Sequence, residues 1–174
     1  VPYFVVGATL YSMSATYVLT SIGTISGSGR VSMADNGTQM LVLVPGGNGY
    51  IYNHVTDVFA QITDVDFTAN GNPQIVVYID GFFCLTTDSK KFIVSALNNG
   101  LSYNALDFGT AESDPDEIVA PIVYKNQLFI GGSQTIEAFQ NIGGADFPFQ
   151  RTGLFLPKGI NSPFSIQLIE DTFA

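Results

Sequence analysis

The chain contains few of the residues on which most redox and catalytic sites depend. Its 174 residues include one cysteine, one histidine and no tryptophan. The lone cysteine, Cys84, excludes an intrachain disulfide, which fits assembly in a reducing cytoplasm, and we expect it to be a small buried hydrophobe. The lone histidine, His54, excludes a zinc site built from several histidines, and we expect it in a solvated loop rather than as the base of a serine triad.

Basic residues and long apolar runs are also scarce. Six lysines and arginines stand against fifteen aspartates and glutamates, so the formal net charge is −9. Proteins that grip a phosphate backbone concentrate basic residues, so direct nucleic-acid binding is disfavoured. No apolar run approaches the roughly 18 residues of a membrane-spanning helix, and no signal peptide is evident, so we expect no membrane contact.

The residues that are abundant favour β-strands. Hydrophobic residues make up 46% of the chain and charged residues 12%, and short runs rich in Val, Ile, Thr, Tyr and Phe alternate with glycine- and asparagine-containing turns. This pattern predicts an all-β fold of short strands joined by tight connections. So little charge on so apolar a chain also suggests that other subunits cover part of its surface.

A repeat of strong apolar runs indicates the architecture. The runs at 39–44, 74–79 and 127–131 start about 35 and 53 residues apart, which brackets the roughly 40 to 50 residues of a propeller blade. We attribute the longer gap to an inserted loop at 98–117. Because the runs are continuously apolar, both faces of each sheet should be buried, which favours β-propeller blades of four antiparallel strands over the alternative, a β-sandwich.

The repeat divides the chain into units of an incomplete propeller, because both ends look like cuts through a longer protein. We expect the end of one blade, three blades and the start of another, at 1–26, 27–66, 67–110, 111–160 and 161–174. Asp64 and Asp66 are read as the polar end of a strand rather than a catalytic pair. The glycines at 27–30 and 46–49 are read as turns rather than a phosphate cradle, and no cofactor is expected.

An acidic segment at 112–117 is the one cluster of charge. It contains Glu112, Asp114, Asp116 and Glu117. Three interpretations stay open: a solvated loop, a calcium site without the spacing of an EF-hand, and a loop that contacts a basic neighbouring subunit. We expect the predicted insertion to project from a blade edge, where contacts can vary without disturbing the core.

Three strings carry a more specific resemblance. They are GSGRVSMA at 27–34, LFIGGSQTIEAF at 128–139, and PKGI at 157–160 followed by SPF at 162–164. In this order they resemble the packaged-DNA stabilisation, or tail-hub, protein family of short-tailed (podovirus-type) phages. The resemblance covers residues 27 to 170, although 48–115 is matched in pattern rather than in identity.

The resemblance implies a structural virion protein rather than an enzyme. It implies a propeller-bearing hub, present as a ring of copies below the portal and its adaptor, which closes the tail channel so that packaged DNA is retained. Contacts with the adaptor and with a tail needle, spikes or fibres are implied, as are assembly in the host cytoplasm and a place in the phage tail. The alternatives are a sugar-binding or carbohydrate-processing propeller and a cellular propeller scaffold.

Overall fold

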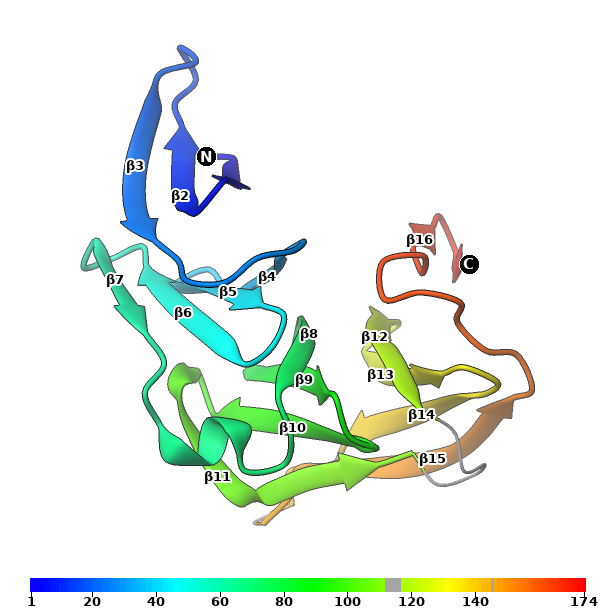
Figure 1. Cartoon of the computed structure of the whole chain (residues 1–174). Helices are drawn as coiled ribbons and strands as arrows, with labels where there is room; N and C mark the ends of the chain where they lie inside the picture. Colours follow the sequence, from blue (N-terminus) through cyan, green and yellow to red (C-terminus); the bar gives the residue numbers. More distant parts are fainter. Residues whose placement is uncertain (112–116, 145) are drawn as a thin grey trace.

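The computed structural model describes residues 1–111, 117–144 and 146–174. In these residues every regular element is a strand except one short 3-10 helix, η1 (Val65–Thr68). The strands form five separate antiparallel sheets arranged one after another along an arc, with the N-terminal and C-terminal sheets at its two ends (Figure 1). No helix in the described ranges is long and apolar enough to cross a membrane.

Three of the sheets have four strands each. The N-terminal sheet has the order β1-β2-β3 and consists of β1 (Tyr3–Val6), β2 (Thr9–Met13) and β3 (Leu19–Thr24). The next has the order β4-β5-β6-β7 and consists of β4 (Ser32–Asp35), β5 (Gln39–Val44), β6 (Asn48–Asn53) and β7 (Val58–Gln61). The third contains β8 (Pro73–Ile79), β9 (Phe82–Thr87), β10 (Lys91–Ala96) and β11 (Asn99–Thr110). The fourth contains β12 (Ile118–Tyr124), β13 (Gln127–Gly132), β14 (Ile136–Asn141) and β15 (Phe149–Leu156), and the last is the pair β16 (Leu168–Ile169) and β17 (Thr172–Phe173).

Each four-stranded sheet runs from the inside of the arc to its rim. The first strands, β4, β8 and β12, lie on the concave side, and the fourth strands, β7, β11 and β15, lie farthest out (Figure 1). The chain then returns from each outer strand to the inner strand of the next sheet. The predicted all-β fold with four-stranded antiparallel blades is therefore confirmed.

The second strand of each four-stranded sheet is buried on both faces. In β5, Met40 and Val42 pack in the cluster shared with the N-terminal sheet, whereas Leu41 and Leu43 pack against the following sheet. The same alternation recurs in the next two sheets, where the second and fourth residues of the strand face the preceding sheet and the third faces the following one. Both-face burial explains why these strands are continuously apolar.

The repeat register differs from the predicted one. The second strands begin at Gln39, Phe82 and Gln127, so the spacings are 43 and 45 residues. The predicted run at 74–79 belongs to β8, a first strand, which is nearly as apolar as β5 because it too is packed between neighbouring sheets. The predicted spacings of 35 and 53 residues therefore compared a first strand with second strands. Most of the predicted insertion at 98–117 was wrong, because residues 99–110 form the fourth strand β11.

Turn residues in the left-handed conformation support this register. Asp80, Lys125 and Glu170, spaced 45 residues apart, begin the turns after β8, β12 and β16 with φ of 50°, 46° and 49°. Such values are disfavoured for residues with a Cβ, and their recurrence at one position reflects the tight turns that antiparallel neighbours require. One turn geometry therefore repeats at the same place in three successive sheets.

Candidate functional site

The residues considered for chemistry are dispersed through the fold. Within the described ranges no group of three His, Cys, Asp or Glu side chains is placed to hold a metal ion. Cys84 is fully buried in the cluster between the β8–β11 and β12–β15 sheets, and burial raises the pKa of its thiol. A buried thiol with a raised pKa is a poor nucleophile, so the structural interpretation of Cys84 suits its position.

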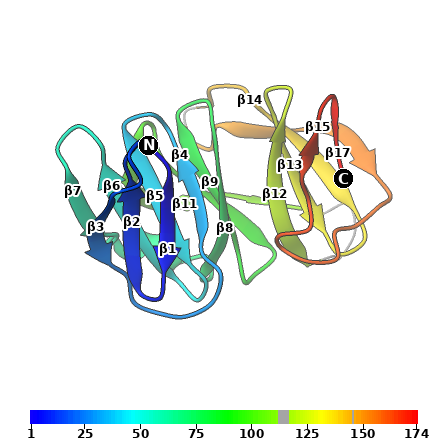
Figure 2. The same ribbon diagram turned by 90° about the horizontal axis from the view of Figure 1, so that it is seen from above.

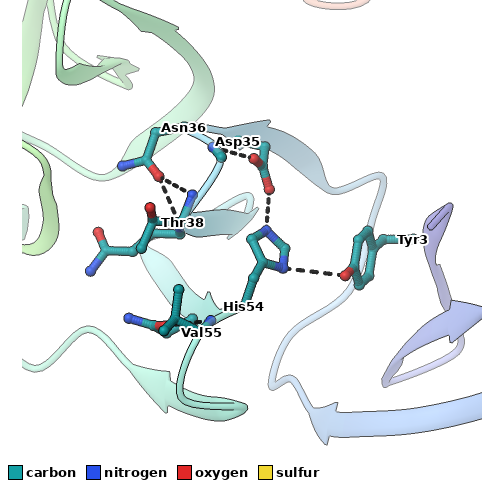
Figure 3. A network of polar contacts seen from close by, with 9 residues as sticks. Tyr3, Asp35, Asn36, Thr38, His54 and Val55 are labelled. Carbon is teal, nitrogen blue, oxygen red and sulfur yellow. Dashed lines mark hydrogen bonds and ion pairs between the residues drawn. The ribbon is translucent and has the colours of Figure 1, made fainter.

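His54 joins two sheets. It lies in the turn after β6, where its Nε2 bonds to Asp35 Oδ2 and its Nδ1 lies 3.2 Å from the Tyr3 hydroxyl of β1 (Figure 3). With Nε2 protonated, the ring donates to Asp35 and accepts from Tyr3. The imidazole is 20% exposed and also packs edge-on against Tyr52. His54 lies in a loop, as expected, but the expectation that its ring is solvated was wrong. The ring contacts Asp35, Tyr3 and Tyr52.

Asp64 and Asp66 lie at the start of the short helix η1. Asp64 caps η1, with Oδ1 accepting from the Asp66 backbone N–H at 3.0 Å. Its Oδ2 accepts from the Tyr103 backbone N–H on β11 at 2.9 Å. An N-terminal cap of this kind satisfies a free backbone donor, and here it also joins the connection before β8 to the outer strand of that sheet.

The acidic segment is only partly described. Glu112, Asp114 and Asp116 lie outside the described residues, whereas Glu117 is exposed immediately before β12. Glu117 lines a hollow of about 640 Å³ together with Asp88 and Lys90 of the turn after β9 and Asn161 of the C-terminal connection. Residues from three parts of the chain therefore surround the position where the predicted contact loop ends.

The strings that carry the family resemblance lie at joints between sheets. In the first string, the buried Ser32 hydroxyl accepts from the Val76 backbone N–H at 3.1 Å and so links β4 to β8. A hydroxyl bridge between the inner strands of two sheets supplies a partner for a buried backbone donor. This string therefore sets how closely these two blades approach on the concave side.

The second and third strings contact each other. The Ile160 backbone N–H donates to Gly132 O at 2.8 Å, and the Ile160 side chain covers Gly131, where a Cβ would overlap it. Gly159 lies so close to the Ser133 backbone that a Cβ there would collide with the carbonyl. Glycine is required at such sites because the two backbones approach too closely for a side chain. The joint therefore attaches the C-terminal connection to the β12–β15 sheet.

The first and third strings meet as well. The Arg30 guanidinium lies 4.1 Å from the centre of the Phe164 ring, a cation–π contact between the loop before β4 and the connection before β16. Such a contact at an exposed site contributes about 0.5 to 1 kcal/mol. Although these residues are far apart in the sequence, the curvature of the arc brings their loops together.

One joint has no counterpart in the sequence-based predictions. The buried Glu137 carboxylate of β14 pairs with Arg151 of β15, with Oε2 and Nε 2.7 Å apart. Arg151 also donates to Thr110 O of the neighbouring sheet at 3.1 Å. The signal for this pair was present, since Glu137 is a carboxylate inside an otherwise apolar run. Its partner could not be identified because Arg151 belongs to an outer strand with little apolar periodicity.

Comparisons with known proteins agree with this arrangement. A family model described as Bacteriophage P22 Gp10, beta-propeller, matches residues 1–174. Among solved structures, the computationally designed Ika8 protein superposes with a TM-score of 0.57 at 12% identity, covering 98% of this chain and 56% of Ika8. BamB from Moraxella catarrhalis superposes with a TM-score of 0.52 at 12% identity, covering 97% of this chain and 52% of BamB.

A shorter designed protein is matched over most of its length. The computationally designed Ika4 protein gives a TM-score of 0.53 at 14% identity, with 83% of this chain and 82% of Ika4 covered. Identities this low support the fold alone, and a search of curated proteins found no match. The fold comparison and the family model together identify the four-stranded sheets as β-propeller blades.

Proposed function

The chain belongs to the family described as Bacteriophage P22 Gp10, beta-propeller, and from this membership we propose that it acts in the phage tail as a hub that helps to retain packaged DNA. Membership makes it a phage structural protein with a propeller fold and implies a place in the virion. In the proposed role, copies of the chain form a ring beneath the portal and its adaptor. The ring closes the tail channel and holds a needle, spikes or fibres on its other side.

The observation that carries this proposal is the position of the family-like strings. They meet at the joints between sheets, through Ser32 on Val76, Ile160 on Gly132 and Arg30 on Phe164. Residues that pack between successive sheets suit a protein that must keep a fixed shape, because each repeat is stabilised by its neighbours. This is the pattern expected of a rigid component in a larger assembly.

The acidic character of the chain fits a wall of a DNA channel. A formal net charge of −9 repels the phosphate backbone, so DNA could pass without adhering. Retention would then come from physical closure of the channel by the assembled ring rather than from affinity for the duplex.

The acidic segment is proposed to contact a basic neighbouring subunit. Glu117 is exposed at the edge of the hollow beside Asp88 and Lys90, so a partner could reach it. Replacing Glu112, Asp114, Asp116 and Glu117 with Ser or Asn should leave the melting temperature nearly unchanged and slow incorporation into particles at low salt, because exposed pairs contribute only about 0 to 1 kcal/mol each. If the variant is incorporated normally at every salt concentration, the segment is only a solvated loop.

Electron microscopy of intact particles tests the hub proposal directly. Particles carrying the chain fused to a small tag should show the extra density in a ring between the portal and the distal tail. Particles assembled without the protein should package DNA and then lose it. The matched control is a particle in which the same tag is placed on a capsid protein. If the tag fused to this chain appears on the capsid shell, or if particles without the protein retain their DNA, the proposed role is overturned.

A further inference from the structure

The concave side of the arc holds a shallow groove. It has a volume of about 360 Å³ and is bordered by the inner strands of four successive sheets. Its lining consists of Met33, Ala34 and Asp35 of β4, Val76, Val77 and Tyr78 of β8, Ile122 and Val123 of β12, and Leu168 of β16. Four segments spread across most of the chain therefore line a single groove.

Apart from Asp35, the lining consists of apolar side chains and Tyr78, and part of it faces solvent. Leu168 is 57% exposed and Met33 is 38% exposed, and Val77, Tyr78 and Val123 are partly exposed. Contiguous apolar side chains left open to water commonly mark a surface that a partner covers. The concave side therefore has the composition of a binding groove.

The turns next to the groove carry excess negative charge. The turns after β8 and β16, on the upper side in Figure 2, contain the exposed residues Asp80, Glu170 and Asp171, two or three residues along the chain from the lining residues Tyr78 and Leu168. Lys125 in the equivalent turn after β12 is the opposing charge there, and its ammonium lies 5.0 Å from the centre of the Tyr124 ring. Asp35 adds less, because its oxygens accept from the Gly37 backbone N–H and bond to His54.

The inner strands also have a terminal backbone edge, which at Val76 of β8 is already bonded to the Ser32 hydroxyl. β4, β8 and β12 are each the terminal strand of their sheets, paired only on the outward side in the sheet order. Terminal strands facing a groove suit an extended peptide, which can bond to backbone groups while its side chains alternate between the groove and its rim.

We propose that this groove binds an extended segment of a partner protein in which apolar residues alternate with lysine or arginine. The apolar side chains would cover Met33, Val77 and Leu168, and the cations would pair with Asp80, Glu170 and Asp171 at the rim. The charge of the rim selects a basic segment, and it opposes duplex DNA for the same reason. The proposal concerns the groove alone and does not depend on the place of the protein in the virion.

A labelled peptide tests the groove. The probe is a fluorescein-labelled peptide of about eight residues that alternates valine and lysine, with a valine–glutamate peptide as the charge-reversed probe, read by fluorescence anisotropy at low and high salt. We expect saturable binding of the basic probe alone. The double substitution Asp80→Lys with Glu170→Lys should weaken it about tenfold or more, and Leu168→Asp should weaken it to a similar extent.

Asp146→Lys is the matched control. Asp146 is exposed in the turn between β14 and β15, away from the groove, so it brings the change of charge of one rim substitution to an outer position and is compared with Asp80→Lys alone. We expect Asp146→Lys to weaken binding of the basic probe less than about twofold, because salt screens a charge far from the groove. If Leu168→Asp lowers the melting temperature by more than a few degrees, Met33→Asp on β4 replaces it.

Several results would overturn the proposal. They are no saturable binding of the basic probe up to about 1 mM, equal affinity for the glutamate probe, and equal weakening by Asp146→Lys and Asp80→Lys alone. Saturable binding of a fluorescein-labelled short DNA duplex to the protein, weakened by Leu168→Asp, would assign the groove to nucleic acid. A dimer in sedimentation that Leu168→Asp disrupts would assign it to a second copy of the chain.

Discussion

The second and fourth strands of the blades differ in almost every respect. β5, β9 and β13 are each six residues long, and nearly every residue in them is buried. The outer strands β3, β7, β11 and β15 have six, four, twelve and eight residues, and most of the residues in β3 and β15 are exposed. Register shifts interrupt the pairing of the outer strands β3, β11 and β15, but they also occur where β9 and β13 pair with the first strands of their sheets.

The difference shows where the repeat is constrained. A second strand must fit two neighbouring sheets at once, so its length and its apolar character are limited by packing on both faces. An outer strand has solvent on its far edge, so it can lengthen, bulge or gain polar residues at little cost. The repeat is therefore conserved in its inner half and free to diverge in its outer half.

The largest expected effect is the difference in stability loss between truncating a leucine in a second strand and truncating one in an outer strand. Leu128 in β13 is fully buried, whereas Leu106 in β11 is 79% exposed. Leu128→Ala should lower the free energy of unfolding by about 2 to 5 kcal/mol, because it removes buried methyl groups and leaves a cavity. Leu106→Ala should change it by less than about 0.5 kcal/mol. Urea denaturation of both variants checks the comparison, and similar losses would show that the outer strand is as constrained as the inner one.

The Glu137–Arg151 pair joins the third strand of its sheet to the outer strand and should have the next largest effect. Arg151→Met leaves the Glu137 carboxylate buried without its cation, and we expect a loss of about 1.5 to 3 kcal/mol in the free energy of unfolding. The paired substitution Glu137→Ile with Arg151→Leu should be nearly neutral. In the other blades, Tyr50 and Ile93 occupy the equivalent position opposite the second strand.

The two substitutions separate charge from packing. If the doubly substituted protein is as unstable as Arg151→Met, the pair is required for its shape and its hydrogen bond to Thr110 rather than for charge compensation. Urea denaturation of the single variants Glu137→Ile and Arg151→Leu completes the double-mutant cycle.

The stability that the turn between β6 and the outer strand β7 contributes should depend on pH. The Tyr52 hydroxyl of β6 donates to Asp57 Oδ1 at 2.6 Å, and this hydrogen bond, with burial, raises the pKa of Tyr52 to about 12. Because the folded-state pKa lies above the unfolded value near 10, this stabilisation is complete below pH 10 and is lost as pH rises toward 12.

Tyr52→Phe removes this titration. We expect the variant to be less stable than the native chain at neutral pH and to lose less stability between pH 10 and 12. Tyr11→Phe, on the N-terminal sheet, is the control and should leave the alkaline profile of the native chain unchanged. Thermal melting monitored across this pH range makes the measurement, and parallel profiles for Tyr52→Phe and the native chain would contradict the assignment.

The smallest effect concerns the repeated turn. Lys125 has a φ of 46°, a conformation that asparagine tolerates better than lysine. Lys125→Asn should therefore raise the free energy of unfolding by about 0.5 to 1 kcal/mol, whereas Lys125→Ala should bring no gain. A stabilisation by both variants would assign the gain to removal of the charge rather than to the backbone conformation.

The sequence predicted the inner half of the blades better than the outer half. Runs such as 39–44 and 127–131 were identified because burial on both faces leaves an unbroken apolar pattern. β11 was missed because its residues alternate irregularly between polar and apolar, and because Asn99 and Gly100 resemble a turn although they begin the strand. Apolar pattern therefore locates a strand without giving its place in the sheet.

The strings that lie at the joints between sheets were recognised in the sequence, but their contacts could not be derived from it. The strings around Ser32, Gly131 and Ile160 were recognised by resemblance, whereas their contacts depend on which backbones approach in space. The requirement for glycine at 159 comes from the Ser133 carbonyl, 26 residues earlier in the chain. His54 shows the same limit, since its partners Asp35 and Tyr3 lie on two different sheets.

The equivalent burial of the second strands has a consequence for how such proteins can change length over evolution. Because every blade offers the same face to its predecessor and the same opposite face to its successor, one whole unit could be duplicated or deleted without creating an unmatched interface. With units of 43 and 45 residues, such an event corresponds to an in-frame duplication or loss of about 130 base pairs of coding sequence. Related genes should therefore differ in length by multiples of this unit more readily than by fractions of it.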